Sequence, residues 1–221
     1  MLGLTINVDT VISTGIAAVI VLAFAFYLAA KATAKVPSRL QLIFETVTDQ
    51  VERQVEANLG IRTAPFVVPL AISLFLFILI SNWLAVLPHA WEEYIRPPTA
   101  DVNLTFALSF SVVILVWATG IRVKGKGFFS HLAQPYPLML PLNILEELAK
   151  PVSLSLRLFG NILSGTVMVS LLALLPAAVQ WLPTSAWKLF DIFIGLLQAL
   201  IFALLTIIYF GMAAAKEEGA H

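Results

Sequence analysis

Five long runs of apolar residues constrain this chain more than any other feature. They cover roughly residues 11–30, 66–87, 104–121, 142–175 and 187–215. A helix of about 20 apolar residues crosses a hydrocarbon core of about 30 Å. Only 12% of the side chains are charged, whereas soluble domains carry about 25%, so a water-soluble fold is excluded. We predict an all-α, polytopic membrane protein in which the whole chain forms one unit with five membrane-embedded helices.

Basic residues predict the orientation of these helices. No lysine or arginine precedes the first apolar run, whereas Lys31, Lys35 and Arg39 follow it, which favours a retained helix with the N-terminus outside. Five spans then place the C-terminus in the cytoplasm. Inside segments also hold Arg53, Arg62, Arg122, Lys124 and Lys126, and outside segments hold only Arg96 and Lys188. Trp91 and Tyr94 in an outside loop are typical of an interfacial aromatic belt. We expect a multi-pass protein of the cell (inner) membrane.

An amphipathic helix is predicted between the first two spans. Its apolar positions recur at helical spacing, and mainly acidic side chains fill the others. The apolar set is Leu40, Phe44, Val47, Val51, Val55 and Leu59, and the polar set is Glu45, Asp49, Glu52, Arg53 and Glu56. Because a helix that binds lipid head groups is more usually basic, this polar face either docks a partner or is simply solvated.

Several classes of function are excluded by what the sequence lacks. The 13 basic and 13 acidic residues cancel, which removes the broad positive field that nucleic-acid binding requires. There is no cysteine, and His89, His131 and His221 have no metal-ligand spacing. Neither a nucleotide-binding loop nor a hydrolase motif is present. We expect no cofactor, no metal ion and no catalytic site of the chain's own.

The fourth apolar run contains Arg157, and a charge at mid-membrane is costly and rarely incidental. At about 100° per residue, five further polar side chains fall within about 40° of it on one helical face. They are Glu146, Lys150, Ser153, Asn161 and Ser164. This stripe rises about 27 Å, nearly the depth of the hydrocarbon, and predicts a polar path. Pro151 removes a backbone donor and is expected to bend the helix just before the arginine.

Structural interpretations of the same residues stay open. Arg157 on its own could snorkel to the interface. Asn143 and Glu146 have capping-box spacing, so Glu146 and Glu147 could belong to a helix N-terminus. Lys150 could pair with Glu146 at i,i+4.

The fifth apolar run carries a second stripe. Asp191, Gln198 and Tyr209 lie within about 20° of one another by the same arithmetic. A buried acid and a buried amide on one face favour a proton route, although Gln198 could instead form an interhelical hydrogen bond and Asp191 could be an interfacial acid. Small residues repeat beside the stripe, where two membrane helices can approach closely. They are Gly195, Ala199 and Ala203. The last two helices, both long, are expected to pack as a hairpin.

Two segments closely resemble subunit a of the F-type ATP synthase. One is Lys150-Pro-Val-Ser-Leu-Ser-Leu-Arg157-Leu-Phe-Gly-Asn161, and the other runs from Leu197 to Tyr209. The resemblance extends over essentially the whole chain. It implies a proton-translocating stator of the membrane (Fo) sector, which works with a ring of c subunits that each carry one carboxylate. It also implies peripheral stalk b subunits and the remaining synthase subunits as partners.

The resemblance further implies roles for the two stripes. The residue matching Arg157 faces the ring carboxylate and separates two offset aqueous half-channels. Glu146 and Glu147 are implied to line the inner half-channel, and Asn161, Asp191 and Gln198 the outer one. Ser153, Ser164 and Tyr209 are expected to complete the polar pathway.

Two departures from the family pattern affect the acidic residues. Many relatives carry an acid where this chain has Thr166, and a histidine where it has Asp191. We therefore expect Asp191 to be the outer proton relay and Thr166 to be at most a hydrogen-bonding wall. The inner carboxylate of many relatives matches Asn143, so either Glu146 or Glu147 is expected to replace it.

A secondary transporter or anion carrier is the alternative function, with Arg157 as the counter-charge of its substrate. Such a protein predicts inverted repeats or a pair of broken helices that meet at the midplane. The sequence contains neither feature.

Overall fold

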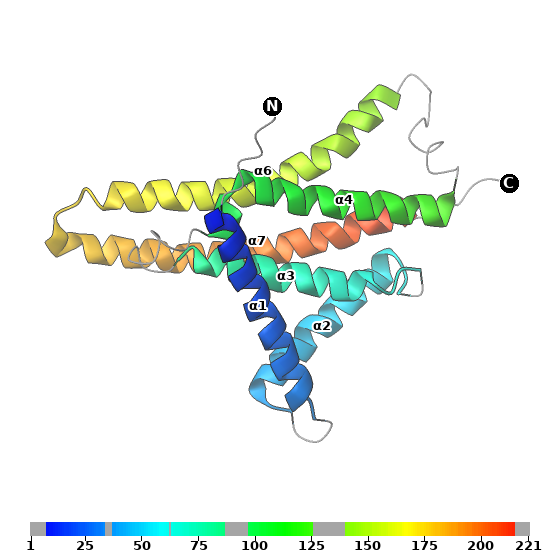
Figure 1. Ribbon diagram of the computed structural model, residues 1–221, viewed down its shortest axis with the longest axis horizontal. Helices are drawn as coiled ribbons and strands as arrows, with labels where there is room; N and C mark the ends of the chain where they lie inside the picture. The colour runs from blue at the N-terminus through cyan, green and yellow to red at the C-terminus, as the bar shows by residue number, and fades with distance from the viewer. Residues whose placement is uncertain (1–7, 34–36, 62, 87–96, 126–139, 215–221) are drawn as a thin grey trace. The chain divides into compact units, whose positions relative to one another are not determined.

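The computed structural model describes residues 8–33, 37–61, 63–86, 97–125 and 140–214, and within them it contains helices and no strand (Figure 1). The helices are α1 Val8–Lys31, α2 Arg39–Asn58, α3 Val67–Leu84, the 3-10 helix η2 Pro98–Ala100, α4 Val102–Lys124, α6 Leu140–Leu172 and α7 Ala177–Ala214. All but α2 and η2 are long and apolar enough to cross a membrane. The predicted all-α fold with five such helices is therefore confirmed.

Two predicted features of the last helices need correction. α7 begins at Ala177 rather than at Trp187, because the polar residues and the proline before Trp187 lower the hydropathy without ending the helix. α6 already includes Leu140, so Asn143 lies within its first turn and the capping-box interpretation of Asn143 and Glu146 is wrong. Several residues used in the topology and metal-site arguments lie outside the described ranges. They are Lys35, Arg62, Trp91, Tyr94, Arg96, Lys126 and the three histidines.

The chain divides into two compact units. Unit 1 comprises the described residues of Met1–Lys31, Phe75–Thr105 and Leu156–Leu200. Unit 2 comprises those of Ala32–Leu74, Phe106–Ser155 and Ile201–His221. Because α3, α4, α6 and α7 each contribute residues to both units, each unit is a bundle of helix segments.

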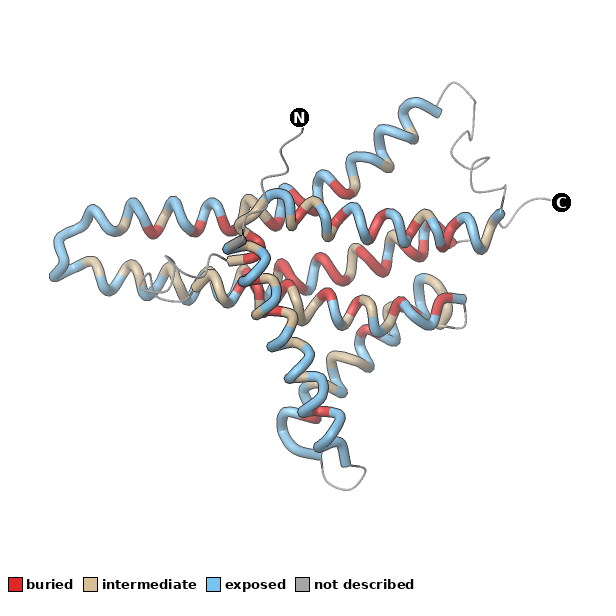
Figure 2. Tube along the Cα trace, in the orientation of Figure 1, coloured by how far each residue is buried: buried red, intermediate tan, exposed pale blue. Residues whose placement is uncertain are grey.

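In unit 1, the start of α4 holds α1 through one carboxylate. Asp101 Oδ1 accepts a hydrogen bond from the backbone N–H of Asn103 at 2.8 Å, which satisfies a free donor at the beginning of the helix. Its Oδ2 accepts one from the Thr10 hydroxyl at 2.8 Å. Ser13, Ala17 and Leu28 are buried in α1, and most of its other residues are exposed or half-buried (Figure 2), as suits a helix that faces lipid or another subunit.

In unit 2, the last turns of α7 form the core. Phe202, Ile207 and Phe210 are fully buried, and the Phe66 ring meets the Phe210 ring edge-on at a centroid distance of 5.7 Å. A Cβ added to Gly211 would lie 2.7 Å from the backbone oxygen of Asn58 at the end of α2. Only a glycine allows this close approach.

The predicted amphipathic helix is α2, also in unit 2. Ser38 caps it by accepting a hydrogen bond from the Gln41 N–H at 3.2 Å, which is typical of a serine N-cap. Val51 and Val55 are buried on its apolar face. Its acidic side chains, which are Glu45, Asp49, Glu52 and Glu56, are exposed. The prediction of an amphipathic helix is confirmed.

Candidate functional site

Arg157 lies near the middle of the 33-residue helix α6, in unit 1, and its side chain is exposed. The next residue, Leu158, is fully buried, so the arginine stands on the face of α6 that turns away from the core. Among the described residues, no hydrogen bond or ion pair reaches the Arg157 guanidinium. Within a membrane, an exposed guanidinium without an ion pair needs a counter-charge.

The other members of the α6 stripe share this environment. Glu146, Ser153 and Ser164 are exposed, and Lys150 and Asn161 are half-buried. The Ser164 hydroxyl donates to the Asn161 backbone oxygen at 2.9 Å. One continuous helix carries all of these residues, and most of them are exposed within the part of the chain that the structure describes.

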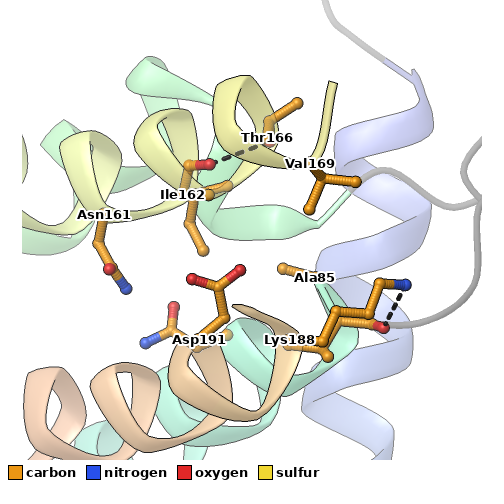
Figure 3. A pocket seen from close by; sticks show the side chains of 10 residues that line it. Ala85, Asn161, Ile162, Thr166, Val169, Lys188 and Asp191 are labelled. Atoms are coloured by element: carbon orange, nitrogen blue, oxygen red, sulfur yellow. Dashed lines mark hydrogen bonds between the residues drawn. The ribbon is translucent and has the colours of Figure 1, made fainter. Parts of the chain in front are cut away.

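Unit 1 contains a small cavity of about 40 Å³, with a mixed polar and apolar lining, between segments of α6, α7 and the end of α3 (Figure 3). Its polar lining residues are Asn82, Asn161, Thr166, Lys188 and Asp191, and its apolar ones are Ala85, Val86, Ile162, Gly165 and Val169. A buried water needs roughly 10–15 Å³ and two to four polar partners. The cavity is therefore of a size and polarity that suit about three water molecules.

The Asp191 carboxylate points from α7 toward α6 in Figure 3. A Cβ added to Gly165 would lie 3.0 Å from Asp191 Oδ2 and 3.3 Å from Oδ1, so the missing side chain of this glycine makes room for the carboxylate. The Thr166 hydroxyl donates to the Ile162 backbone oxygen at 3.0 Å, within its own helix. The close approach of Gly165 on α6 to Asp191 on α7 confirms, within unit 1, that the two helices pack as the predicted hairpin. Asp191 and Asn161 therefore line one cavity.

Three hydrogen bonds join α7 to the end of α3 and to the residues just after it, within unit 1. Asn82 Nδ2 donates to the Gly195 backbone oxygen at 3.2 Å, and Trp83 Nε1 donates to that of Ile192 at 3.3 Å. Lys188 Nζ donates to the Val86 backbone oxygen at 3.3 Å. Sequence reasoning missed Asn82 and Lys188 as cavity residues. The spacing of Lys188 could have predicted its place near Asp191, because residues three apart in a helix lie on one face.

The α7 stripe is divided between the two units. Gln198 belongs to unit 1 and is 6% exposed, and its Nε2 has no hydrogen-bond partner among the described residues. Tyr209 belongs to unit 2, where the Lys150 ammonium lies 5.5 Å from the centre of its ring. A cation at this distance over a tyrosine face is attracted by the ring.

Glu147 and Lys150 form an ion pair in unit 2, which corrects the expected pairing of Lys150 with Glu146. Glu147 is favoured because the Trp117 indole Nε1 donates to its second oxygen at 3.3 Å, whereas Glu146 lies on the exposed face. The side chains of Lys150 and Glu147 are 14% and 22% exposed. Glu146 has no ion pair or hydrogen bond through its side chain in the described part of the chain. The two neighbouring acids therefore differ sharply in what surrounds them.

No group of three acidic or histidine side chains that could hold a metal ion occurs within the described ranges. The described residues offer instead an exposed arginine without an ion pair, an acid beside a cavity with room for about three waters, and an acid that is paired with a lysine. These features define a polytopic membrane protein whose polar groups lie along two long helices.

Comparison with known proteins identifies the family. A family model described as ATP synthase A chain matches residues 11–211. The chain is 48% identical to the ATP synthase subunit a of Acidothermus cellulolyticus, over 100% of this chain and 81% of that protein. It is 49% identical to the ATP synthase subunit a of Mycobacterium marinum and 33% identical to that of Desulforamulus reducens, in each case over 100% of this chain and over 92% and 85% of those proteins.

The chain therefore belongs to the ATP synthase A chain family, as the resemblance of its two motifs implied. It is a multi-pass membrane protein and the proton-translocating component of the Fo sector, and its partners are other subunits of the ATP synthase.

Proposed function

We propose that Arg157 is the fixed positive charge that separates two proton half-channels and faces the carboxylates of a rotating ring of c subunits. The observation that carries this proposal is the exposed guanidinium, which no described residue of the chain pairs with. Arginine remains charged even when it is desolvated, because a guanidinium holds its proton far more strongly than an ammonium does. Within a membrane such a charge requires a counter-charge, and a ring carboxylate supplies one.

The chemistry of this encounter is a matter of electrostatics. A guanidinium close to a carboxylate favours the ionised form of that carboxylate. Each ring carboxylate must therefore release its proton before it passes Arg157, and the released proton enters the half-channel on that side. A lysine is a poor substitute, because it deprotonates more readily when it is desolvated.

Asp191 is the proton relay of the outer half-channel. It lines the cavity together with Asn161, and the cavity suits about three waters, which is enough for a short hydrogen-bonded chain. Gln198, two turns further along α7, offers a buried amide donor to a water or to the ring. Ser164 continues the polar surface on α6, and Thr166 is a wall of the cavity because its hydroxyl is already engaged.

Glu146 is the acid of the inner half-channel. Its neighbour Glu147 is neutralised by Lys150 and also accepts a hydrogen bond from the Trp117 indole, whereas Glu146 is exposed and is aligned with Arg157 by helical spacing. Ser153 lies between Glu146 and Arg157 in this alignment and completes the inner path. Tyr209 contributes through its contact with Lys150.

The direction of transport follows from the predicted topology, with the N-terminus outside and the C-terminus in the cytoplasm. A proton that moves inward gains about 2.3 kcal/mol per 100 mV, and the offset of the two half-channels converts this energy into rotation. α6 and α7 have 33 and 38 residues, which corresponds to about 50 and 57 Å. Both exceed a core of about 30 Å, so we propose that the hairpin is strongly tilted. Peripheral stalk b subunits hold the chain in place, and the acidic face of α2 is a docking surface for a partner.

The proposal is tested with Arg157→Ala in the assembled complex. ATP-driven proton pumping into inverted vesicles is expected to fall by at least about tenfold, because the barrier between the half-channels is lost. Leu156→Ala is the matched control, since this exposed leucine is adjacent on the same helix, and it should pump normally. Equal amounts of c subunit must co-purify with each variant. Undiminished pumping by the assembled Arg157→Ala complex would overturn the proposal.

A further inference from the structure

Among the described residues that line the cavity of unit 1, Lys188 and Asp191 are the two that carry a charged group. The segments of α3 and α6 that line it contribute uncharged side chains, among them Asn82, Asn161 and Thr166. Lys188 precedes Asp191 by one turn of α7, and the two groups interact electrostatically. A deprotonated Asp191 would therefore have Lys188 as the counter-charge within its own cavity.

The Lys188 ammonium does not contact the Asp191 carboxylate here. It points away from the carboxylate and donates to the Val86 backbone oxygen at 3.3 Å (Figure 3). No ion pair joins Lys188 and Asp191 among the residues that the structure describes. The bond to Val86 is long for an ammonium donor, and an ionised carboxylate is the stronger acceptor. A lysine has a flexible four-carbon stem, and side chains three residues apart on a helix are neighbours, so both acceptors are within its reach.

We propose that Lys188 is the mobile counter-ion of Asp191 and thereby a positioning residue for proton transfer. The ammonium rests on the Val86 carbonyl while Asp191 carries its proton. When the O–H bond of Asp191 breaks and its proton passes through water to the ring carboxylate, the ammonium swings to the carboxylate that remains. It returns when a proton from the outside re-forms the O–H bond. Lys188 stays protonated throughout, so only one proton moves in each cycle. This inference rests on the proposed role of Asp191 as the outer relay.

The counter-ion has a specific physical task. A carboxylate left without compensation among uncharged side chains is strongly disfavoured, and Asp191 would then hold its proton rather than pass it on. A nearby positive charge stabilises the ionised state. The counter-ion role of Lys188 therefore depends on its positive charge, and not on its hydrogen bond to the Val86 oxygen.

Two substitutions separate charge from hydrogen bonding. Lys188→Gln keeps a donor for the Val86 oxygen but removes the charge, and Lys188→Arg keeps both. In the assembled complex, we expect proton flux to fall about three- to tenfold in Lys188→Gln and to stay within about twofold of the original in Lys188→Arg. Equal flux in Lys188→Gln and the unmodified complex would overturn the counter-ion role. The hydrogen bond of Lys188 to Val86 would then have a structural role only.

A charge probe inside the cavity gives a second readout. A purely structural role of the hydrogen bond between Lys188 and Val86 would not change it. The chain has no cysteine, so Ala85→Cys places a unique thiol of this chain on the cavity lining. Its rates of alkylation by iodoacetate and by uncharged iodoacetamide are compared in sealed vesicles that expose the outer face, and the label is read on this subunit alone after the subunits have been separated. The iodoacetate to iodoacetamide ratio is expected to fall about three- to fivefold in Lys188→Gln and to be preserved in Lys188→Arg.

The outcomes distinguish this inference from the proposed function. An unchanged alkylation ratio in Lys188→Gln would overturn the counter-ion role. If neither reagent reacts from the outer face, or if Asp191→Asn conducts protons normally, then the outer half-channel itself is wrong and the role of Lys188 fails with it. If Asp191→Asn loses flux while Lys188→Gln matches the original in flux and ratio, only the inference about Lys188 fails.

Discussion

Two acids on the long helices, Asp191 in unit 1 and Glu147 in unit 2, have opposite surroundings. The Glu147 carboxylate is paired with Lys150 and also accepts a hydrogen bond from Trp117 at 3.3 Å. Asp191 has no ion pair within the described residues, and it borders a cavity of about 40 Å³ beside Gly165. One carboxylate is fully engaged by its own chain, and the other is placed beside space for water.

The difference shows why an intramembrane acid cannot be assigned a role from its position alone. A carboxylate that is neutralised by a fixed cation stabilises the bundle and has little reason to exchange its proton. A carboxylate that borders a hydrated cavity has a route for protons to reach it. The contacts thus favour Asp191 as a relay and Glu147 as a structural residue, and substitutions at each position test this contrast.

The largest expected effect is that of Asp191→Asn. Asparagine keeps the size of the side chain but cannot take up a proton, so proton flux should fall by at least about tenfold, since positioned proton-transfer groups contribute factors of about a hundred or more. Flux is measured as ATP-driven acidification of inverted vesicles, at equal content of this subunit. Glu147→Gln is the matched control and should retain most of the flux. Similar losses in both variants would remove the contrast between the two acids.

Much of the architecture behind this contrast was predictable from the sequence. The five apolar helices and the amphipathic α2 follow from hydropathy and helical spacing, because these patterns reflect burial in lipid or at an interface. The alignment of Arg157 with Glu146 and Ser164 on one face follows from helical geometry alone. That these residues lie on one helix is confirmed by the 33 residues of α6, and their roles stay predictions.

The cavity and the partners of individual charges were not predictable in the same way. Lys150 has Glu146 and Glu147 within reach, and Trp117 of α4, about 30 positions earlier in the chain, engages the second of them. Likewise, the proximity of Gly165 to Asp191 depends on how α6 packs on α7 within unit 1. Contacts between helices that are distant in sequence leave no periodic signal, and only the packed structure reveals them.

A smaller effect is expected for Gly165→Ala. The new Cβ would lie 3.0 and 3.3 Å from the two Asp191 carboxylate oxygens, so the carboxylate must shift by a few tenths of an ångström. Because proton transfer depends on alignment at this scale, flux should fall about two- to fivefold with normal assembly. Gly15→Ala on α1 is the control, since no atom lies within 4 Å of an added Cβ there. Unchanged flux in Gly165→Ala would show that the position of Asp191 is not critical.

Glu147→Gln should lower stability rather than flux. It leaves the half-buried Lys150 ammonium without its counter-charge, and we expect a loss of about 2 kcal/mol in the free energy of unfolding. The measurement is the temperature at which the detergent-solubilised complex releases this subunit. Adding Lys150→Met should recover most of the loss, because removal of both partners of an ion pair is far less costly than removal of one. A double variant as unstable as Glu147→Gln alone would argue against the ion pair as the cause.

The smallest effect is expected for Trp117→Phe. Phenylalanine retains an aromatic ring but has no indole N–H, so the 3.3 Å hydrogen bond to Glu147 is lost while the ion pair with Lys150 remains. A single hydrogen bond contributes about 0.5–1.5 kcal/mol, and the length of this one places the expected loss near the lower end. Trp181→Phe is a suitable control, because Trp181 is 66% exposed and its substitution should leave the release temperature unchanged.

In the Glu147→Gln background the effect of Trp117→Phe should shrink, since the indole then faces a neutral acceptor rather than a carboxylate. An effect of Trp117→Phe that is equally large in both backgrounds would mean that the indole acts through packing, and the engagement of Glu147 would then rest on Lys150 alone.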